Sequence, residues 1–446
     1  MIMAGLVPAI HVFNSSAALK TRVPGKKPGM TNMNCTILLR RVVRIFAFAA
    51  ALLFVPGHAA AQPAFDQFIQ SLWPEAQKLG VSRKTFDAAT RGLTPDTSLP
   101  DLEIPGRVVS PPAQPEFVQT PEQYVSENLI ARFALQGKQY AAKYRETLQA
   151  IEQRFGTPGN VLLAIWARET SFGGAKLPHD AVRVLATQAW VGRRKAQFRE
   201  EFLFALKMLD EGHVTRAAMK SSWAGALGHT QFLPSDFFKN AVDFDGDGKR
   251  DIWNSIPDAL ASAGKQLADK GWQRGTRWAH EVRAPENIDC SKAEPGFKLS
   301  VGEWLKFGIV PARGRKLSDA DLLEEASLLM PEGSYGPAFL TTKNYFVLKD
   351  YNFSDLYVLF VGHLADRIGG APRFETPWGK SKQLRTAEVE EMQRILLKHG
   401  HYRDKLDGKA GMLTRAALGE YQKKNGLKLD CWPTRAVLDH MRRAKK

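Results

Sequence analysis

The chain has 446 residues, of which 44% are hydrophobic, and its formal net charge is +16. This length and apolar content predict two or three folded domains, while the lack of low-complexity tracts and of solenoid-period repeats excludes a disordered or solenoid protein. Much of the charge belongs to residues 381–446, which contain sixteen Lys or Arg and eight Asp or Glu. Such a basic segment suits an anionic partner: nucleic acid, a membrane surface or a carboxylate-bearing cell wall.

The N-terminal segment has the three parts of a secretory signal peptide. Arginines precede an apolar run at residues 45–55, and three alanines at 59–61 form a small-residue cleavage site. We therefore expect residues 1–61 to be removed, with translation starting at Met30 or Met33.

An N-terminal membrane anchor is the alternative, but the apolar run is shorter than the roughly 20 residues that span a bilayer. Cys35 precedes the run, whereas a lipid-attachment cysteine would follow it. No later segment has the length and hydrophobicity of a transmembrane helix, so the mature chain is expected to be soluble in the periplasm. Export makes the cell wall the favoured partner and argues against nucleic acid.

Two cysteines, Cys290 and Cys431, remain after removal of the signal peptide. Export permits a disulfide between them. Because they fall in different predicted domains, the sequence favours two unpaired thiols.

The chain between the signal peptide and the C-terminus changes character several times. Proline-rich sequence is expected to be extended, and glycine followed by proline ends a helix. The predicted segments are proline-rich 98–121, mostly helical 122–269, mixed with short β pieces 272–346, helical 356–368, a linker at 373–382 and a small helical unit after it.

Glu169 stands near the end of the apolar segment VLLAIWARETSFGG, residues 161–174. Thr157 and Pro158 supply an N-cap and a proline at the first helical position, so a helix is predicted to run to about Phe172. Helical spacing places the acid on one face with three apolar residues: Leu162, Ile165 and Trp166.

Partial burial on that face would raise the pKa of the carboxyl group by disfavouring its charged form, and a protonated carboxyl can act as a general acid. The alternative is a structural acid at the border of an amphipathic helix, paired with Arg168 or Arg193.

Two further motifs follow. SSWAGALGHTQFLPSDF, residues 221–237, combines a Gly-Ala-Leu-Gly turn with Gln231, and KDYNFSDLY covers residues 349–357. Together with ARETSFG they resemble the lytic murein transglycosylases of the membrane-bound lytic transglycosylase B family, from about Phe65 to Ile368. The resemblance implies a lysozyme-like, mainly helical domain with an added helical lobe and a small β section.

The resemblance also implies functional residues, because Glu169 matches the single catalytic acid of the family. The residues that match its sugar-binding cleft are Ser222, Gln231, Tyr351, Asn352 and Tyr357. Core packing is the alternative role for the two tyrosines. The sequence departs from the family at Arg168, where a small or apolar residue is usual, and near Gln266, where an aromatic residue is usual.

The motifs contain no second candidate carboxylate, whereas ordinary glycosidases use two. The resemblance implies that Glu169 protonates the oxygen between N-acetylmuramic acid and N-acetylglucosamine. The N-acetyl group would stabilise the oxocarbenium-like centre. The ionised acid would then accept the proton of the muramic C6 hydroxyl while a 1,6-anhydro ring closes. The alternatives are a hydrolytic muramidase of lysozyme type and a non-catalytic peptidoglycan-binding scaffold.

The segment DFDGDGKRDIWN, residues 243–254, has the spacing of a calcium loop, with glycine at the sharp turn. The predicted ligands of a structural Ca²⁺ are Asp243, Asp245, Asp247, Lys249 through its carbonyl, Asp251 and Asn254. Asparagine at the last position predicts weaker binding than the usual glutamate. The transglycosylase family has a related loop here; an ion-free turn is the alternative. No cofactor is expected for catalysis.

The C-terminal segment resembles the peptidoglycan-binding domain found in many wall hydrolases. The matching residues are Asp407-Gly408, Gly411, Thr414-Arg415-Ala416-Ala417 and Tyr421-Gln422. Apolar stripes at Val389, Met392 and Leu396, and at Leu413, Ala417 and Tyr421, predict a three-helix unit. A basic helical tail is the alternative. The positive charge would favour acidic stem peptides and keep the enzyme near its substrate.

The predicted fold is therefore mainly α (α+β). It comprises a signal peptide at 1–61, a lysozyme-like catalytic domain at 62–372, a linker at 373–382 and a three-helix peptidoglycan-binding module at 383–444. The expected partners are peptidoglycan glycan strands, with cell-wall synthesis or division proteins as further candidates.

Overall fold

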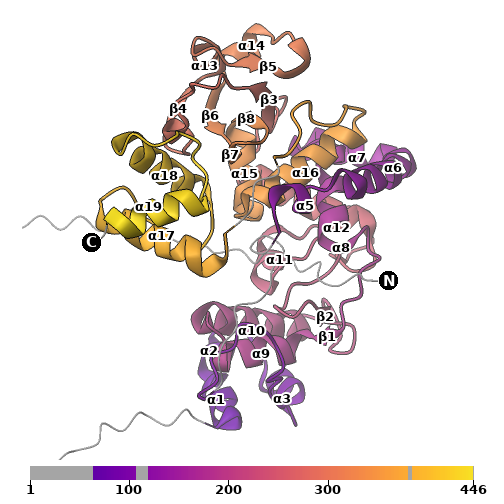
Figure 1. The fold of residues 1–446 in the computed structure, drawn as a ribbon. Helices are drawn as coiled ribbons and strands as arrows, with labels where there is room; N and C mark the ends of the chain where they lie inside the picture. Colours follow the sequence, from indigo (N-terminus) through magenta and orange to yellow (C-terminus); the bar gives the residue numbers. More distant parts are fainter. Residues whose placement is uncertain (1–63, 107–118, 380–383, 445–446) are drawn as a thin grey trace, which may run out of the picture. The chain divides into compact units, whose positions relative to one another are not determined.

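The computed structural model describes residues 64–106, 119–379 and 384–444 (Figure 1). The predicted signal peptide and the middle of the proline-rich stretch lie outside these residues. Within the described ranges, no helix combines the length and the hydrophobicity needed to cross a membrane.

Helices dominate the described chain, as predicted. One hydrophobic core is formed by apolar residues of the helices that precede the five-stranded sheet, of the sheet itself and of the two helices that follow it, α15 and α16. The helices before the sheet are α1 (Phe65–Ser71), α2 (Trp73–Lys78), α3 (Arg83–Thr90), α5 (Pro121–Tyr124), α6 (Glu127–Lys143), α7 (Arg145–Phe155), α8 (Gly159–Thr170), α9 (Ala181–Val191), α10 (Lys195–Asp210), α11 (Pro234–Asn240) and α12 (Ile256–Asp269).

The mixed region contains the predicted β section, an antiparallel sheet with strand order β4-β6-β8-β3-β5. Its strands are β3 (Ala279–Arg283), β4 (Lys298–Ser300), β5 (Val310–Pro311), β6 (Glu325–Leu329) and β8 (Ala338–Thr341), with β7 (Pro331–Ser334), α13 (Val301–Leu305) and α14 (Asp319–Leu323) between them. A small pair, β1 (His179–Asp180) and β2 (Lys220–Ser221), lies among the helices. After the sheet, α15 (Lys343–Tyr351) and α16 (Asp355–Ile368) return to the helical core.

Helix α8 is a central helix, packed against α16, α6, α12 and α7. Pro158 is its N-cap and Gly159 its first residue, so the predicted start at Thr157 and Pro158 was one position early; the Thr157 hydroxyl instead donates a hydrogen bond to the Gly264 carbonyl. Nearly every residue of α8 is buried, which is typical of a helix surrounded by other helices and not of the amphipathic helix expected from spacing.

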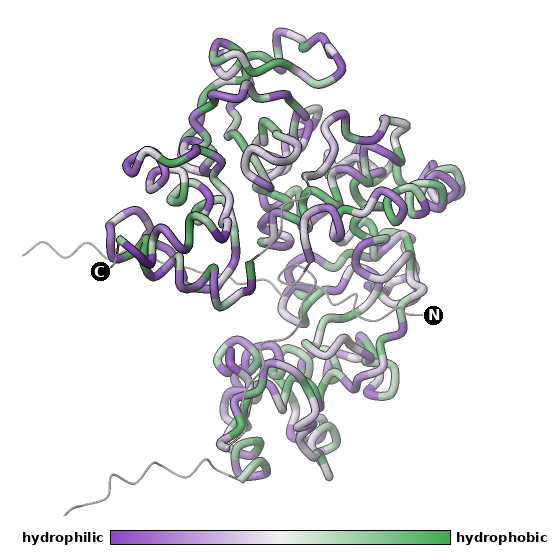
Figure 2. The backbone as a smooth tube through the Cα atoms, in the orientation of Figure 1, coloured by the Kyte–Doolittle hydropathy of each residue, from purple (hydrophilic) through white to green (hydrophobic). Residues whose placement is uncertain are grey.

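The C-terminal module has the three predicted helices, α17 (Thr386–Lys398), α18 (Met412–Lys424) and α19 (Arg435–Ala444), around a small core of its own. Figure 2 shows hydrophobic and hydrophilic residues alternating along these helices. The stripe expected on α18 was partly wrong. Leu413 is exposed, while Met412 and Leu418 are buried with Ala417 and Tyr421. The buried face is wider than the stripe because α18 also packs against the β section.

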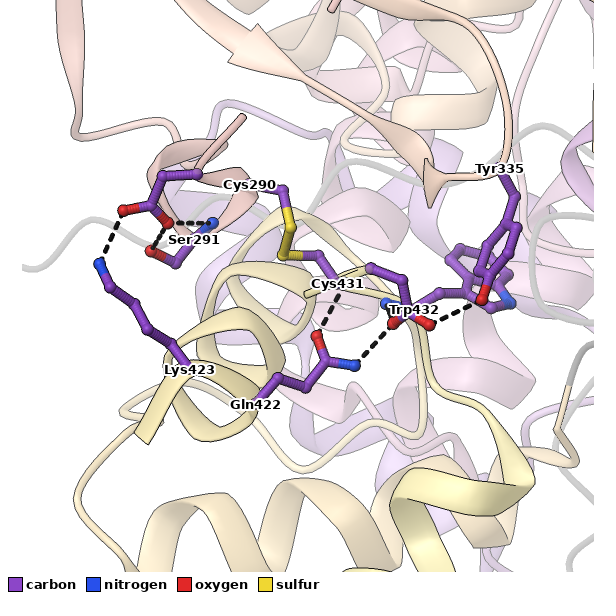
Figure 3. Close-up of a disulfide and its surroundings, with 9 residues drawn as sticks. Cys290, Ser291, Tyr335, Gln422, Lys423, Cys431 and Trp432 are labelled. Carbon is purple, nitrogen blue, oxygen red and sulfur yellow. Dashed lines mark hydrogen bonds and ion pairs between the residues drawn. A yellow bond between two sulfur atoms is a disulfide. The ribbon is translucent and has the colours of Figure 1, made fainter. Parts of the chain in front are cut away.

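Cys290 and Cys431 form a disulfide with a Cα–Cα distance of 6.1 Å (Figure 3). The expectation of two unpaired thiols was therefore wrong. Both cysteines belong to the hydrophobic core of the β section, so the connection between α18 and α19 is built into that core. The assignment of the two residues to different domains did not reveal that these domains share a packed interface.

Candidate active site

Glu169 is placed by the end of α8. The helix stops at Thr170, and Ser171, Phe172 and Gly173 continue in the left-handed region with φ of 51°, 57° and 82°. The helix therefore ends just after the acid, two residues before the predicted end at about Phe172, because the chain turns into the left-handed region. The Glu169 side chain is only 4% exposed, so the acid lies inside the helical core.

Two tyrosines from α15 and α16 lie beside this acid. The Tyr357 hydroxyl donates a 2.6 Å hydrogen bond to Glu169 Oε1. Tyr351 is stacked on Tyr357 with ring centroids 6.4 Å apart, and its hydroxyl donates to the Thr230 carbonyl at 2.6 Å. Burial, and then the charge of Glu169, raise the pKa of both phenols well above the ordinary value, so both remain hydrogen-bond donors.

The turn before α11 holds two predicted sugar-binding residues. Ser222 Oγ accepts hydrogen bonds from the backbone N–H groups of Ala224 and Ala226, at 3.4 and 3.2 Å. The Gln231 amide donates to the Gly228 carbonyl at 2.9 Å, and Gln231 has a left-handed φ of 56°. A non-glycine residue held in this region is strained, and such strain is common at binding sites. Both side chains shape the turn itself.

His229 lies in the quoted motif but was not singled out from the sequence. Its ring nitrogen Nδ1 accepts from Trp166 Nε1 at 3.1 Å, and its carbonyl accepts from the Thr170 hydroxyl at 2.9 Å. Its backbone N–H donates to Ile252 O at 3.0 Å. Burial lowers the pKa of His229, so the neutral ring is favoured. His229 thereby joins the end of α8 to the turn and to the predicted calcium loop.

Asn352 lies in the turn between α15 and α16, where its Oδ1 accepts the backbone N–H of Ser354 at 3.1 Å. Ser354 caps α16, since its hydroxyl accepts the backbone N–H of Tyr357 at 3.4 Å. The structure therefore brings Tyr351 and Tyr357 to the acid, whereas the contacts of Asn352 order the turn that carries them. Gln266, where the family has an aromatic residue, is buried on α12.

The two arginines proposed as structural partners of the acid have other contacts. The Arg168 guanidinium lies over the rings of Tyr124 and Phe360, 4.2 and 4.9 Å from their centroids. Arg193 pairs with Asp101 at 3.2 Å. The departure from the family at Arg168 is thus accommodated by packing against aromatic rings of α5 and α16.

A second buried glutamate supports the helix that follows the Gln231 turn. Glu201 on α10 accepts the backbone N–H and the hydroxyl of Ser235 at 2.9 and 2.8 Å. Burial raises the pKa of Glu201 to about 7; the Ser235 hydrogen bonds oppose this shift, and the nearby Asp236 and Glu200 add to it.

This shift makes folding stability depend on pH. Between the ordinary pKa of 4.5 and about 7 the folded protein holds a proton that the unfolded chain has released, so stability should fall as pH rises through this window. The free energy of unfolding of the wild type should fall by up to about 3 kcal/mol across this window because of Glu201, and Glu201→Gln should lack this fall. Chemical denaturation of both proteins between about pH 5 and pH 8 measures it; parallel curves would contradict the expectation.

The predicted calcium loop lies between α11 and α12, and its carboxylates partly converge. One oxygen each of Asp243, Asp245 and Asp258 lie within 4.8 Å of one another, a spacing that one cation with Ca–O distances near 2.4 Å could bridge. Asp258 was missed because it lies beyond the twelve-residue window, in the first turn of α12. Asp251 instead receives hydrogen bonds from the backbone and side-chain amides of Asn254.

Two of the predicted ligands, Asp243 and Asp247, order the backbone of the loop. Asp247 Oδ1 accepts the N–H of Lys249 at 2.8 Å, and Asp243 accepts those of Gly246 and Gly248 at 2.7 and 2.9 Å. The oxygen-only donor set is the kind that Ca²⁺ prefers. The three converging carboxylates and the oxygen-only donor set therefore fit a calcium ion.

The sequence matches the transglycosylase SLT domain family over residues 64–366 and a peptidoglycan binding domain over residues 385–441. It is 25% identical over 321 residues to membrane-bound lytic murein transglycosylase B of Escherichia coli (strain K12), covering 70% of this chain and 84% of that protein.

Solved structures share the fold. SltB3 from Pseudomonas aeruginosa, in complex with NAG-anhNAM-pentapeptide, matches with a TM-score of 0.77 and 37% identity, over 85% of this chain and 99% of that chain. The Escherichia coli lytic transglycosylase Slt35 in complex with calcium matches in fold with a TM-score of 0.51 and 22% identity, over 70% of this chain and 95% of that chain. With its three motifs assembled around one buried acid, the chain belongs to the transglycosylase SLT domain family.

Proposed function

We propose that this lytic murein transglycosylase uses Glu169 as its general acid and base. The protein cleaves the bond between N-acetylmuramic acid and N-acetylglucosamine in peptidoglycan and leaves 1,6-anhydromuramic ends. The observation that carries the role of Glu169 is its buried hydrogen bond to Tyr357, because it joins the first and last of the three motifs at one carboxyl group.

This hydrogen bond also gives the two oxygens of the Glu169 carboxyl group different roles. Since Oε1 accepts the hydrogen bond from the Tyr357 hydroxyl, the proton that reaches the glycosidic oxygen is carried by Oε2. The same oxygen then accepts the proton of the muramic C6 hydroxyl as that hydroxyl attacks C1. One carboxyl group suffices because the nucleophile belongs to the substrate and is held next to the reacting carbon.

The sugar-binding role extends to the residues that surround Glu169. We assign to glycan contacts five residues that lie on the two turns near the acid or on the helix ends beside them: Ser222, Gln231, Tyr351, Asn352 and Tyr357. The basic C-terminal module holds the enzyme on peptidoglycan. The N-terminal sequence supports export by a signal peptide, and the periplasm is accordingly the proposed location.

Product analysis tests the reaction. Purified mature protein is incubated with murein sacculi in water enriched in oxygen-18, and the products are measured by mass spectrometry. Anhydromuramic ends without label are expected. Labelled reducing ends would assign the protein to the hydrolytic muramidases, and intact sacculi would leave a wall-binding scaffold.

We further propose that the 243–258 segment binds a structural Ca²⁺. The converging oxygens of Asp243, Asp245 and Asp258 support the proposal, and so does the hydrogen bond from His229 to Ile252 at the end of the loop. When bound, the ion would neutralise the repulsion among these carboxylates and order the chain behind the Gln231 turn. It takes no part in the chemical steps.

Calcium should therefore stabilise the folded protein. A ligand at one hundred times its dissociation constant adds about 2.7 kcal/mol to the free energy of unfolding. We expect the melting temperature to rise with millimolar calcium relative to chelator, and Asp245→Asn to lose most of this rise. Magnesium serves as the control ion, since it prefers smaller octahedral sites. Equal melting curves with calcium and chelator would refute the site.

A further inference from the structure

Arg415 belongs to the C-terminal module, but its guanidinium group forms an ion pair with a residue of the catalytic domain. Its Nη2 lies 3.2 Å from Asp355 Oδ2, and the side chains of Arg415 and Asp355 are 5% and 9% exposed. Figure 1 shows the two helices involved, α18 and α16. An ion pair between exposed side chains contributes little, but a pair with both members buried is costly to break because one charge stays behind without its partner.

Asp355 is bound from both sides. Its Oδ1 accepts hydrogen bonds from the Tyr345 hydroxyl at 2.7 Å and from Lys349 Nζ at 2.6 Å, and both of these residues are on α15. Its Oδ2 accepts the hydrogen bond from Arg415. Burial by itself would raise the pKa of Asp355, but the charges of Lys349 and Arg415 outweigh it and hold that pKa well below its usual range. The carboxylate is therefore ionised, and one of its two oxygens depends on the module.

Asp355 is also close along the chain to Tyr357, the tyrosine that contacts Glu169. It is the first residue of α16, and Tyr357, two residues later in the same turn, donates the hydrogen bond to Glu169. The hydroxyl of the preceding Ser354 caps this turn by accepting the backbone N–H of Tyr357. Asn352 in turn accepts the backbone N–H of Ser354. A shift of Asp355 would therefore move the phenol that orients Glu169.

The module is held firmly enough to transmit such a constraint. Besides the Cys290–Cys431 disulfide, the Asp430 carbonyl accepts the N–H of Ser334, and its carboxylate accepts the Tyr335 hydroxyl at 2.7 Å (Figure 3). The Arg415 guanidinium is itself fixed by a hydrogen bond to the Ala410 carbonyl. The position of Arg415 relative to the sheet thus follows from several independent contacts.

We propose that Arg415 is a positioning residue of the active site, supplied by the wall-binding module. Through Asp355 it sets the start of α16 and so the hydrogen bond from Tyr357 to Glu169. The module then contributes to the chemical step, and not only to attachment on the wall. This inference rests on the proposed role of Glu169.

The test uses the full mature chain and a soluble substrate, uncross-linked glycan oligomers without stem peptides, so that attachment to sacculi does not limit the rate. Arg415→Gln should lower kcat about tenfold or more, since small displacements of catalytic groups have effects of this size. KM should change much less, and the pH profile of kcat should shift because the partner of the acid has moved. Arg415→Lys should recover part of the loss, since it keeps the charge but lacks the forked geometry.

Arg442→Gln is the matched control, because Arg442 also pairs with a carboxylate of the module, Glu391 at 2.7 Å, but in an exposed position.

Melting curves verify folding of each variant. If Arg415→Gln does not fold, the folded Arg415→Lys protein decides: a lowered kcat with a shifted pH profile supports the proposal. Wild-type kcat and pH profile in the folded variants, with only the melting temperature lowered, would overturn it. Glu169→Gln in the same assay separates the two ideas, because its activity tests the proposed function whatever Arg415 does.

Discussion

Replacing Glu169 with glutamine is expected to lower kcat by about a thousandfold or more, because a positioned general acid contributes factors of this order and we propose that this one acts in both steps. Glutamine has nearly the same shape, and its carbonyl oxygen can still accept the Tyr357 hydroxyl. The folded structure should therefore persist. Release of anhydromuramic products from sacculi, followed over time by liquid chromatography, measures the loss.

A buried glutamate outside this site provides the control. Glu332 in β7 is 1% exposed, and its Oε2 accepts the N–H of Gly379 at 2.7 Å. Glu332→Gln should keep its kcat even if its melting temperature falls. If Glu169→Gln cleaved murein at the wild-type rate, the proton donor would have to be another group.

Removing the disulfide should have the largest effect on stability. Cys290 and Cys431 are 141 residues apart, and a cross-link that closes so long a loop restricts the unfolded chain strongly. We expect replacement of both cysteines by serine to lower the free energy of unfolding by about 2–5 kcal/mol. Calorimetry should show a lower melting temperature, with the module unfolding separately from the catalytic domain.

Reduction supplies the internal control for this prediction. A thiol-free reductant should shift the wild-type melting curve to that of the double serine variant, and it should leave the variant itself unchanged. Identical curves for oxidised wild type and double variant would mean that the remaining contacts, such as Lys423 with Asp289 at 2.8 Å, hold the module without the cross-link.

Patterns within one segment were read well from the sequence. The existence of α8, of the β section and of the three module helices follows from local composition and turn residues, while the end of α8 was predicted two residues late. The importance of Tyr357 came from a motif, and the structure supplies the physical content, a 2.6 Å hydrogen bond to Glu169.

Features that depend on distant residues were not accessible in this way. Asp258 joins the carboxylates of the predicted calcium loop from outside its motif, and the Cys290–Cys431 pair joins two segments assigned to separate domains. Arg415 was matched to a wall-binding pattern, while its partner Asp355 lies 60 residues earlier. For the cysteines and Arg415 the local pattern identifies the residue but not what it touches, and for Asp258 it identifies neither. Only the packing of separate helices and strands supplies this information.

The close fit around Asp430 limits how this enzyme can evolve by recombination. A side chain at Gly333 would place its Cβ 2.0 Å from the Asp430 carbonyl, so the two surfaces admit only a glycine there. A foreign targeting module grafted in this place would lack Cys431, the buried Arg415 and the surface around Asp430 that fits against Gly333. Targeting and catalysis in this protein are expected to be inherited as one unit and not exchanged as interchangeable parts.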